Sequence, residues 1–314
     1  MRLLLHRGNS FDPNFYYHSG LDIDHSFLLV DGKRTLFVPK MNEALARASF
    51  RGKVVAFENA MDTLSGYIRG RRLLFDANSL KARAYVQLAR KCRLKDHSLE
   101  LLRMRSVKKP EEVSAIARAA RHTKEIFHSL DFRKAKTELG VRKQLLVATA
   151  ELGLEPAFDP IVSSCGNSAF PHHEPSGRKL GPLVLVDYGV MYRHYRSDLT
   201  RCFILDGDRK MKSQYETLQG VCHGIIDELP NLRRGKNVAA FAAKAMERAG
   251  FPKMIHSIGH GVGLEIHEFP RLSLKSDDPI AGATMAIEPA FYLKRYGMRY
   301  EETIYFDGKK SRIF

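Results

Sequence analysis

The 314-residue sequence predicts two successive domains, a small α/β domain followed by a larger α+β domain in which helices cover an antiparallel sheet. Three observations lead to this fold class. Short apolar runs alternate with helical patterns over the first hundred residues, longer amphipathic and strand-like segments follow, and a basic Lys-Lys-Pro-Glu-Glu stretch lies between the two patterns. We therefore assign residues 1–105 and 106–314 to the two domains.

A hairpin is the clearest feature of the first domain. Asp31-Gly32-Lys33 is a turn signal that joins predicted strands at residues 26–30 and 35–38. The other elements expected from apolar runs and helical periodicity are strands at 53–57 and 72–75 and helices at 41–49, 61–69 and 80–91. Because strands alternate with helices, we expect a partly parallel sheet.

The second domain is expected to begin with a helix. Pro110 suits the first helical turn, and Glu111 and Glu112 suit its positive end. The elements that hydrophobic periodicity predicts are, in order, helices at 111–130 and 137–152, strands at 161–163, 183–190 and 201–205, helices at 210–228 and 238–249, and strands at 284–293 and 298–306.

The composition is that of a globular protein, with 44% hydrophobic and 27% charged residues, and it excludes a disordered or fibrous chain. No apolar run reaches the ~18 residues of a membrane helix, and the apolar core after Met1 is too short for a secretory signal. The four cysteines form no CxxC pair, so we expect free thiols in a reducing cytoplasm, and no membrane partner.

The net charge of +16, from 51 Lys and Arg against 35 Asp and Glu, raises the question of an anionic partner. The excess of positive charge is spread over both halves of the chain and does not gather in one tail. Short basic runs are usually solvated faces. This distribution disfavours nucleic-acid binding as the function.

Two carboxylates lie at strand positions that a hairpin would bring together. Asp187 ends the apolar run Leu-Val-Leu-Val, and Asp198 follows eleven residues later. A hairpin with its tip at Tyr192 and Arg193 makes the two acids direct cross-strand neighbours, with Cβ atoms ~5 Å apart.

The same arrangement is expected near the carboxyl end. Glu288 and Glu301 are thirteen residues apart, and a tip at Lys294 and Arg295 places them opposite one another. Gly297 offers a position for a bulge, which would shift the pairing but keep the two acids close.

Four carboxylates on apolar strands are costly unless cations neutralise them, and two divalent ions would balance the four charges. The alternative is four ordinary surface acids at strand ends. Taken singly, each residue favours that alternative, whereas the two matched pairs favour a metal site.

Histidines strengthen the metal interpretation. His256, His260 and His267 lie in one glycine-rich stretch, where Gly259, Gly261 and Gly263 argue against the helix of a zincin. Such dense glycines instead allow the backbone to pass close to a metal centre or substrate. Upstream, a turn-like Phe-Pro-His-His-Glu-Pro segment supplies two further histidines, His172 and His173.

This ordered set resembles the metallopeptidases of the pita-bread fold, which include methionine aminopeptidase, aminopeptidase P and prolidase. The resemblance extends over essentially the whole chain, and the segment Asn-Phe-Tyr-Tyr-His-Ser-Gly-Leu after Pro13 resembles a motif of the proline-specific branch. It implies a pita-bread catalytic domain preceded by a creatinase/prolidase-type domain. The implied metal ligands are Asp187, Asp198, His260, Glu288 and Glu301.

The resemblance also implies a two-metal hydrolase. Glu288 would accept a proton from the attacking water as well as bind metal, and His267 and His172 would donate hydrogen bonds to the developing oxyanion. His172 would also contact the substrate. His256 and Arg299 would orient ligands or offset charge. Four oxygen donors and one imidazole suit Mn²⁺ or Co²⁺, with Zn²⁺ or Fe²⁺ as alternatives.

Two residues depart from the family pattern. Ala290 stands where the family usually has glycine, and Glu302 stands where it usually has aspartate after the last ligand. Strand alternation, counted from Arg299, turns Glu301 toward the metals and Glu302 to the opposite face.

The expected substrates are short proline-containing peptides. Arg271 matches an arginine with which prolidases hold the free carboxylate of a Xaa-Pro dipeptide, so we favour a dipeptidase over an aminopeptidase P. Creatinase lacks the five ligands, and methionine aminopeptidase resembles only the second half. A pita-bread binding module is a further alternative, but such relatives have generally lost ligands. The resemblance also implies a homodimer.

Overall fold

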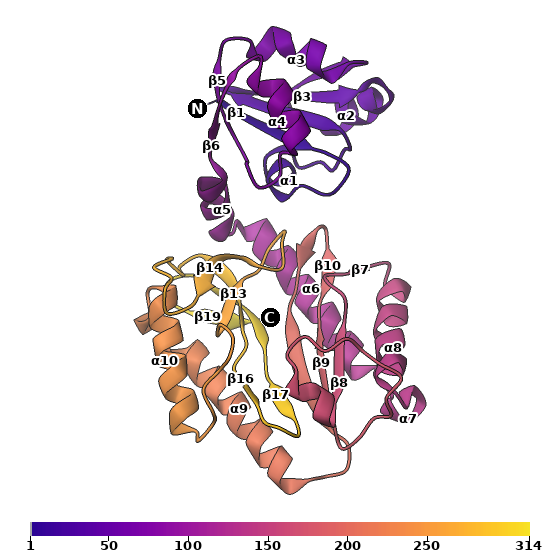
Figure 1. Ribbon diagram of the computed structural model, residues 1–314, viewed down its shortest axis with the longest axis vertical. Helices are drawn as coiled ribbons and strands as arrows, with labels where there is room; N and C mark the ends of the chain where they lie inside the picture. Colours follow the sequence, from indigo (N-terminus) through magenta and orange to yellow (C-terminus); the bar gives the residue numbers. More distant parts are fainter. Residues whose placement is uncertain (1) are drawn as a thin grey trace. The chain divides into compact units, whose positions relative to one another are not determined.

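The computed structural model describes residues 2–314, and the chain divides between Met104 and Arg105 into two compact units (Figure 1). Among the described residues, no helix combines the length with the apolar character that crossing a bilayer requires. All four cysteines are free thiols in the structure.

The first unit is built on a six-stranded mixed sheet in the order β4-β3-β2-β1-β5-β6. Its strands are β1 (Arg2–Arg7), β2 (Ser26–Asp31), β3 (Lys33–Pro39), β4 (Lys53–Phe57), β5 (Arg72–Phe75) and β6 (Arg93–Asp96). Its helices are α1 (Pro13–Ser19), α2 (Glu43–Ser49), α3 (Ala60–Ile68) and α4 (Ala82–Ala89), and α5 (Ser98–Ser106) runs across the boundary between the units.

The hairpin predicted at Gly32 is confirmed, since Asp31 pairs with Lys33 and Gly32 has a φ of 69°. Parallel pairing of β3 with β4 and of β5 with β1 and β6 confirms the partly parallel sheet. Alternate residues of β1 serve opposite faces: Leu3 and Leu5 pack in one hydrophobic cluster and Leu4 in the other. Helices therefore bury both faces of this sheet.

The second unit contains two long helix pairs and several antiparallel sheets. Its helices are α6 (Pro110–His128), α7 (Phe132–Ala135), α8 (Glu138–Glu151), α9 (Arg209–Glu228) and α10 (Gly235–Arg248). Its strands are β7 (Glu155–Pro156), β8 (Ile161–Ser164), β9 (Leu183–Tyr188), β10 (Val190–Tyr192), β11 (Tyr195–Arg196), β12 (Leu199–Ile204), β13 (Gly259–Gly261), β14 (Glu268–Leu272), β15 (Ala283–Ile287), β16 (Ala290–Tyr292), β17 (Gly297–Arg299), β18 (Glu302–Phe306) and β19 (Ser311–Ile313).

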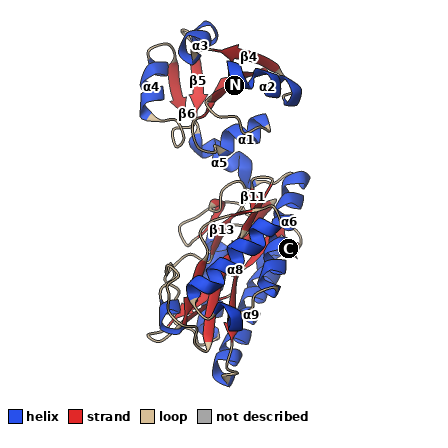
Figure 2. Cartoon of the chain, turned by 90° about the vertical axis from the view of Figure 1, so that its right-hand side faces the viewer, coloured by secondary structure: helices blue, strands red, loops and turns tan. Residues whose placement is uncertain are grey.

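Helices cover these sheets as the sequence predicts. The larger sheets have the orders β12-β9-β8 and β14-β13-β15-β18-β19, and every strand pair in this unit is antiparallel. Side chains of α6 and α8 pack with β8, β9 and β10, while α9 and α10 pack with the strands of the five-stranded sheet. Figure 2 shows α6 and α8 in front of the strands.

Two strands expected to be continuous are broken in the structure, and both breaks lie beside a predicted ligand. The strand predicted at 183–190 is interrupted at Gly189, where an added Cβ would lie 1.8 Å from the carbonyl oxygen of Ser197. The strand predicted at 284–293 is interrupted at Glu288 and Pro289, because proline has no N–H to donate to a ladder. Each break lets the chain change direction next to an acidic side chain.

Candidate active site

The hairpin that carries Asp187 and Asp198 forms, but its predicted register is wrong. Tyr192 pairs with Tyr195, so the turn residues are Arg193 and His194, with φ values of 51° and 66°. Positive φ at both positions is the geometry of a turn that Asn-Gly would normally signal, and these residues carry no such signal. Asp187 therefore lies opposite Thr200.

The error amounts to two residues, so it preserves the face on which the two acids lie. Asp198 is two positions before Thr200 and becomes a diagonal neighbour of Asp187. The backbone of Asp198 is fixed by Thr303 of β18, whose hydroxyl accepts from the Asp198 N–H at 3.0 Å and donates to its carbonyl at 2.6 Å. These two hydrogen bonds therefore attach the segment that carries Asp198 to the five-stranded sheet.

The register predicted for the second pair is confirmed. Ala290 pairs with Arg299 and Tyr292 with Gly297, which places the tip at Lys294 and Arg295. The same register, continued past Pro289, brings Glu288 opposite Glu301. The bulge considered at Gly297 does not occur, because Gly297 takes its regular place in the pairing.

His260 occupies the middle of the three-residue strand β13, between β14 and β15. The flanking glycines are required by close packing: an added Cβ would lie 2.0 Å from the Ala286 carbonyl oxygen at Gly259, and 2.1 Å from the Phe269 carbonyl oxygen at Gly261. The glycine-rich stretch is thus a strand at His260 and not a helix, as its glycines predict.

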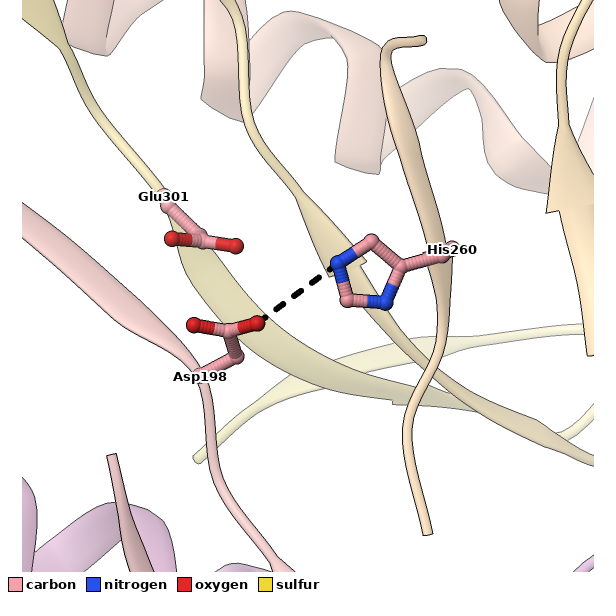
Figure 3. Close-up of side chains that lie close together, drawn as sticks. All are labelled: Asp198, His260 and Glu301. Carbon is pink, nitrogen blue, oxygen red and sulfur yellow. Dashed lines mark ion pairs between the residues drawn. The ribbon is translucent and has the colours of Figure 1, made fainter. Parts of the chain in front are cut away.

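Three of the five predicted ligands converge in Figure 3, each from a different segment. Asp198, His260 and Glu301 each offer one atom, and these atoms lie within 4.8 Å of one another. His260 Nε2 is 3.5 Å from Asp198 Oδ2 and 3.9 Å from Glu288 Oε1, so Glu288 borders the same space. Glu302 instead pairs with Arg201 and Lys124 on the opposite face.

The acids are too buried to remain charged together without a cation. Burial, reinforced by the neighbouring carboxylates, raises the pKa of Asp198 and of Glu301 well above the usual range. Burial raises the pKa of Glu288 to about 8 and also raises that of Asp187, although Arg299 opposes both shifts. Burial lowers the pKa of His260 to about 4, which leaves its imidazole neutral.

This donor set fits divalent cations. Asp187 Oδ1 is buried without a hydrogen-bond partner among the described residues. His260 Nδ1 lies 3.1 Å from the Gly261 carbonyl oxygen, a contact that fixes the tautomer and leaves Nε2 free to coordinate a metal. Carboxylates and a neutral imidazole are the ligands of Mn²⁺, Co²⁺, Zn²⁺ and Fe²⁺ in proteins.

Arg299 is the buried cation beside the cluster. Its guanidinium pairs with Asp187 and donates to Thr200 Oγ1 at 3.0 Å and to the Tyr292 hydroxyl at 3.1 Å. His256 Nε2 also lies 3.1 Å from the Tyr292 hydroxyl, and His256 Nδ1 lies 3.7 Å from Glu288 Oε2. Sequence reasoning missed Tyr292, although strand alternation from Glu288 puts it on the same face.

His267 contacts one of the predicted metal ligands directly, whereas His172 lies in a partly exposed segment. The rings of His267 and His260 meet edge to face, with centroids 4.3 Å apart. His172 is exposed, and a positive charge on its ring lowers the pKa of both Asp187 and His267. Burial lowers the pKa of His267, which favours a neutral ring with one N–H to donate.

Glu138, which sequence reasoning also missed, organises the segment that carries His172. Its fully buried carboxylate accepts from Ser164 N at 2.8 Å and from Ser176 N and Oγ at 3.0 and 2.6 Å. Asn167 Nδ2 and His173 Nε2 complete its contacts at 2.8 and 2.9 Å. The segment between Ser164 and Ser176 is therefore fixed by one acid at the start of α8.

We expect Glu138→Gln to destabilise the protein in a pH-dependent way. Burial alone would raise the pKa of Glu138, but its hydrogen bonds outweigh burial and lower it. A lowered pKa stabilises the fold above the unfolded value of ~4.3 and loses that contribution as pH falls through the folded value. Urea unfolding should show a loss of about 1.5–3 kcal/mol at pH 7 that shrinks below pH ~4.

The exposed Glu151 at the other end of α8 supplies the control, since Glu151→Gln should leave unfolding unchanged at every pH. A destabilisation by Glu138→Gln that is equal at pH 7 and at pH ~3.5 would contradict this account of its charge.

The Arg271 side chain forms no hydrogen bond or ion pair with the four predicted acidic ligands or with the His260 imidazole among the described residues. It is exposed on β14, its backbone pairs with His260, and its guanidinium lies 4.9 Å from the centroid of the Phe269 ring. The structure thus brings together the five predicted ligands, Arg299, His256 and His267, and it leaves Arg271 on the strand beside them.

The profile of metallopeptidase family M24 matches residues 114–307, which include all five predicted ligands. A Xaa-Pro dipeptidase of Pyrococcus horikoshii is 30% identical over 307 residues, which cover 93% of this chain and 87% of that protein.

Solved structures extend the similarity to 99% of the chain. The prolidase from Pyrococcus furiosus matches with a TM-score of 0.87 and 26% identity, and covers 99% of this chain and 95% of its own. An X-Pro aminopeptidase from Thermotoga maritima matches with a TM-score of 0.89 at 22% identity, covering 99% and 95%, which shows a shared fold.

Proposed function

Because this chain belongs to metallopeptidase family M24, we propose that it is a dinuclear-metal peptidase that hydrolyses Xaa-Pro bonds, and specifically a Xaa-Pro dipeptidase. The observation that carries the proposal is the buried cluster of Asp198, His260 and Glu301, bordered by Asp187 and Glu288. Similarity to a Xaa-Pro dipeptidase over 93% of the chain supports the choice of substrate.

The five side chains would hold two divalent ions, for which we favour Mn²⁺ or Co²⁺ over Zn²⁺ or Fe²⁺. When bound, the ions would neutralise the carboxylates, polarise the scissile carbonyl and lower the pKa of the attacking water. Arg299 would offset part of the charge of Asp187 and orient its carboxylate, and His256 would orient Glu288.

Glu288 would take the proton from the attacking water and pass it to the leaving proline nitrogen. It suits that role because its side chain is 16% exposed, more than those of Asp187 and Asp198 at 11% and 7%. His267 would donate its N–H to the developing oxyanion, and His172 would contribute a second contact from the substrate side.

Arg271 would bind the free carboxylate of the proline residue. Its planar guanidinium suits a bidentate pair with a carboxylate, and its strand runs alongside His260. An aminopeptidase P is the alternative within the family. Its site must leave room for the peptide that continues beyond the proline, so it would not hold a free proline carboxylate. A binding module that has lost catalysis is the alternative from another class, but none of the five ligands is missing.

Comparing Met-Pro with Met-Pro-Ala as substrates tests this assignment. We expect the metal-loaded protein to prefer Met-Pro, and Arg271→Ala to raise the KM for Met-Pro about tenfold or more with little change in kcat. Arg248→Ala, an exposed arginine at the end of α10, should change neither parameter. Faster cleavage of the tripeptide, or an unchanged dipeptide KM in Arg271→Ala, would instead favour aminopeptidase P.

We also propose that the protein is a homodimer, as the resemblance to the proline-specific branch implies, and that it acts in the reducing cytoplasm, which its free cysteines favour. Sedimentation equilibrium at micromolar concentration should give twice the mass of the 35.6 kDa chain. A single species with the mass of one chain would contradict the dimer but not the metal site.

A further inference from the structure

A buried cluster of charged residues lies at the end of the loop of residues 263–268, which carries His267. Lys108 Nζ is 3.0 Å from Glu268 Oε2, and Arg105 Nη1 is 3.3 Å from Glu268 Oε1. The side chains of Lys108, Glu268 and Arg105 are only 1%, 1% and 2% exposed. Arg105 also pairs with Glu265, which is partly exposed. Glu268 directly follows His267 in the chain.

The carboxylate of Glu268 contacts the backbone of the loop of residues 263–268 at two positions. Its Oε1 accepts from the Glu265 N–H at 3.0 Å. An added Cβ at Gly263 would lie 2.4 Å from its Oε2, so the chain passes close to the carboxylate at that glycine. Arg196 fastens the same loop from the other side, with its N–H 2.9 Å from the Gly263 carbonyl oxygen and its Nε 3.2 Å from the Leu264 carbonyl oxygen.

Stability alone does not account for so many buried charges. Taking an ion pair out of water costs free energy that the attraction between the charges only roughly offsets, and apolar side chains of similar volume are often equally stabilising. The two cations nevertheless keep Glu268 ionised, since they lower its pKa against the effect of burial. Buried ion pairs of this kind can impose one specific geometry.

We propose that Lys108 and Arg105, acting through Glu268, are positioning residues that hold the loop of residues 263–268 so that His267 keeps its edge-to-face contact with His260. The proposal rests on the proposed function, in which His267 donates to the oxyanion. The ion pairs of Lys108 and Arg105 are with Glu268 and Glu265 of this loop, so their effect on catalysis passes through the loop.

Lys108→Met tests this role without leaving Glu268 unpaired, because Arg105 remains. We expect kcat for Met-Pro to fall about 10- to 100-fold, with KM and the bound metal little changed, and Lys108→Arg to restore most of the rate. Lys236→Met removes a lysine from an exposed ion pair with Asp277 and should leave kcat unchanged. A Lys108→Met protein with wild-type kcat would overturn the proposal.

A double-mutant cycle separates positioning from general destabilisation. If Lys108 acts through His267, Lys108→Met should change kcat less than about twofold in the His267→Ala background. An equal loss in both backgrounds would show that the effect is not carried by His267.

Imidazole resonances of His267, assigned by their loss in His267→Ala, provide a readout that needs no substrate. In the metal-free protein we expect Lys108→Met to shift or broaden them and Lys236→Met to leave them in place. Unchanged resonances in Lys108→Met would overturn the proposal whether or not the protein cleaves Met-Pro. Conversely, an absence of Met-Pro hydrolysis together with shifted resonances would refute the proposed function alone.

Discussion

Replacing Asp198 with asparagine is expected to abolish peptide hydrolysis and to leave fewer than two metal ions per chain. Asp198 is one of the three side chains whose ligand atoms converge within 4.8 Å, and asparagine keeps its shape but removes the charge. The bound metal would stabilise the transition state of hydrolysis by several kcal/mol, and losing that stabilisation corresponds to at least about a 10³-fold fall in kcat/KM. Initial rates with Met-Pro and metal analysis of the purified variant measure the two effects.

The metal-free form of the Asp198→Asn variant should be at least as thermally stable as metal-free wild type. Burial and three neighbouring acids raise the pKa of Asp198, so its ionised form is unfavourable in the folded state without a cation. Asp159→Asn, at a carboxylate whose side chain is 96% exposed, is the matched control and should retain full activity. Near-normal turnover with two ions bound to Asp198→Asn would show that the ligand assignment is wrong.

His267→Ala is expected to keep both metal ions and to lose kcat by about 10²- to 10³-fold, the usual cost of removing one oxyanion donor. The ring of His267 packs on His260, but His267 is not among the five donors. Because the interaction arises in the transition state, KM should change much less than kcat.

His128→Ala, at an exposed histidine that ends α6, is the control for His267→Ala and should behave as wild type. A wild-type rate in His267→Ala would remove this residue from the mechanism. A loss of metal in that variant would instead point to a structural role in holding His260.

The sequence predicts the four long helices of the second unit to within three residues at each end, because each helix spans several turns. For example, the helix predicted at 210–228 is observed from Arg209 to Glu228. Its start was predicted one residue late because the capping role of Asp208 was not recognised. By contrast β1 went unrecognised, although it is the inner strand that joins β2 and β5. Its apolar run is short and buried on both faces, so it carries no alternation to identify it.

The site could be predicted where the residue spacing within one hairpin determines which residues pair. It could not be predicted where segments far apart in the sequence come together. The register of Glu288 against Glu301 follows from the spacing alone, whereas that of Asp187 depends on a turn of Arg193 and His194 with no recognisable signal. Glu138 joins segments up to 38 residues away, a relation that no single periodic pattern encodes.

Proline release from Met-Pro by metal-free protein, followed while Mn²⁺ is added in steps, tests the two-metal peptidase assignment most directly. We predict no release before metal is added and a rise that reaches its limit when two ions are bound per chain. Release of proline by the metal-free protein, or no release with two ions bound, would contradict the assignment.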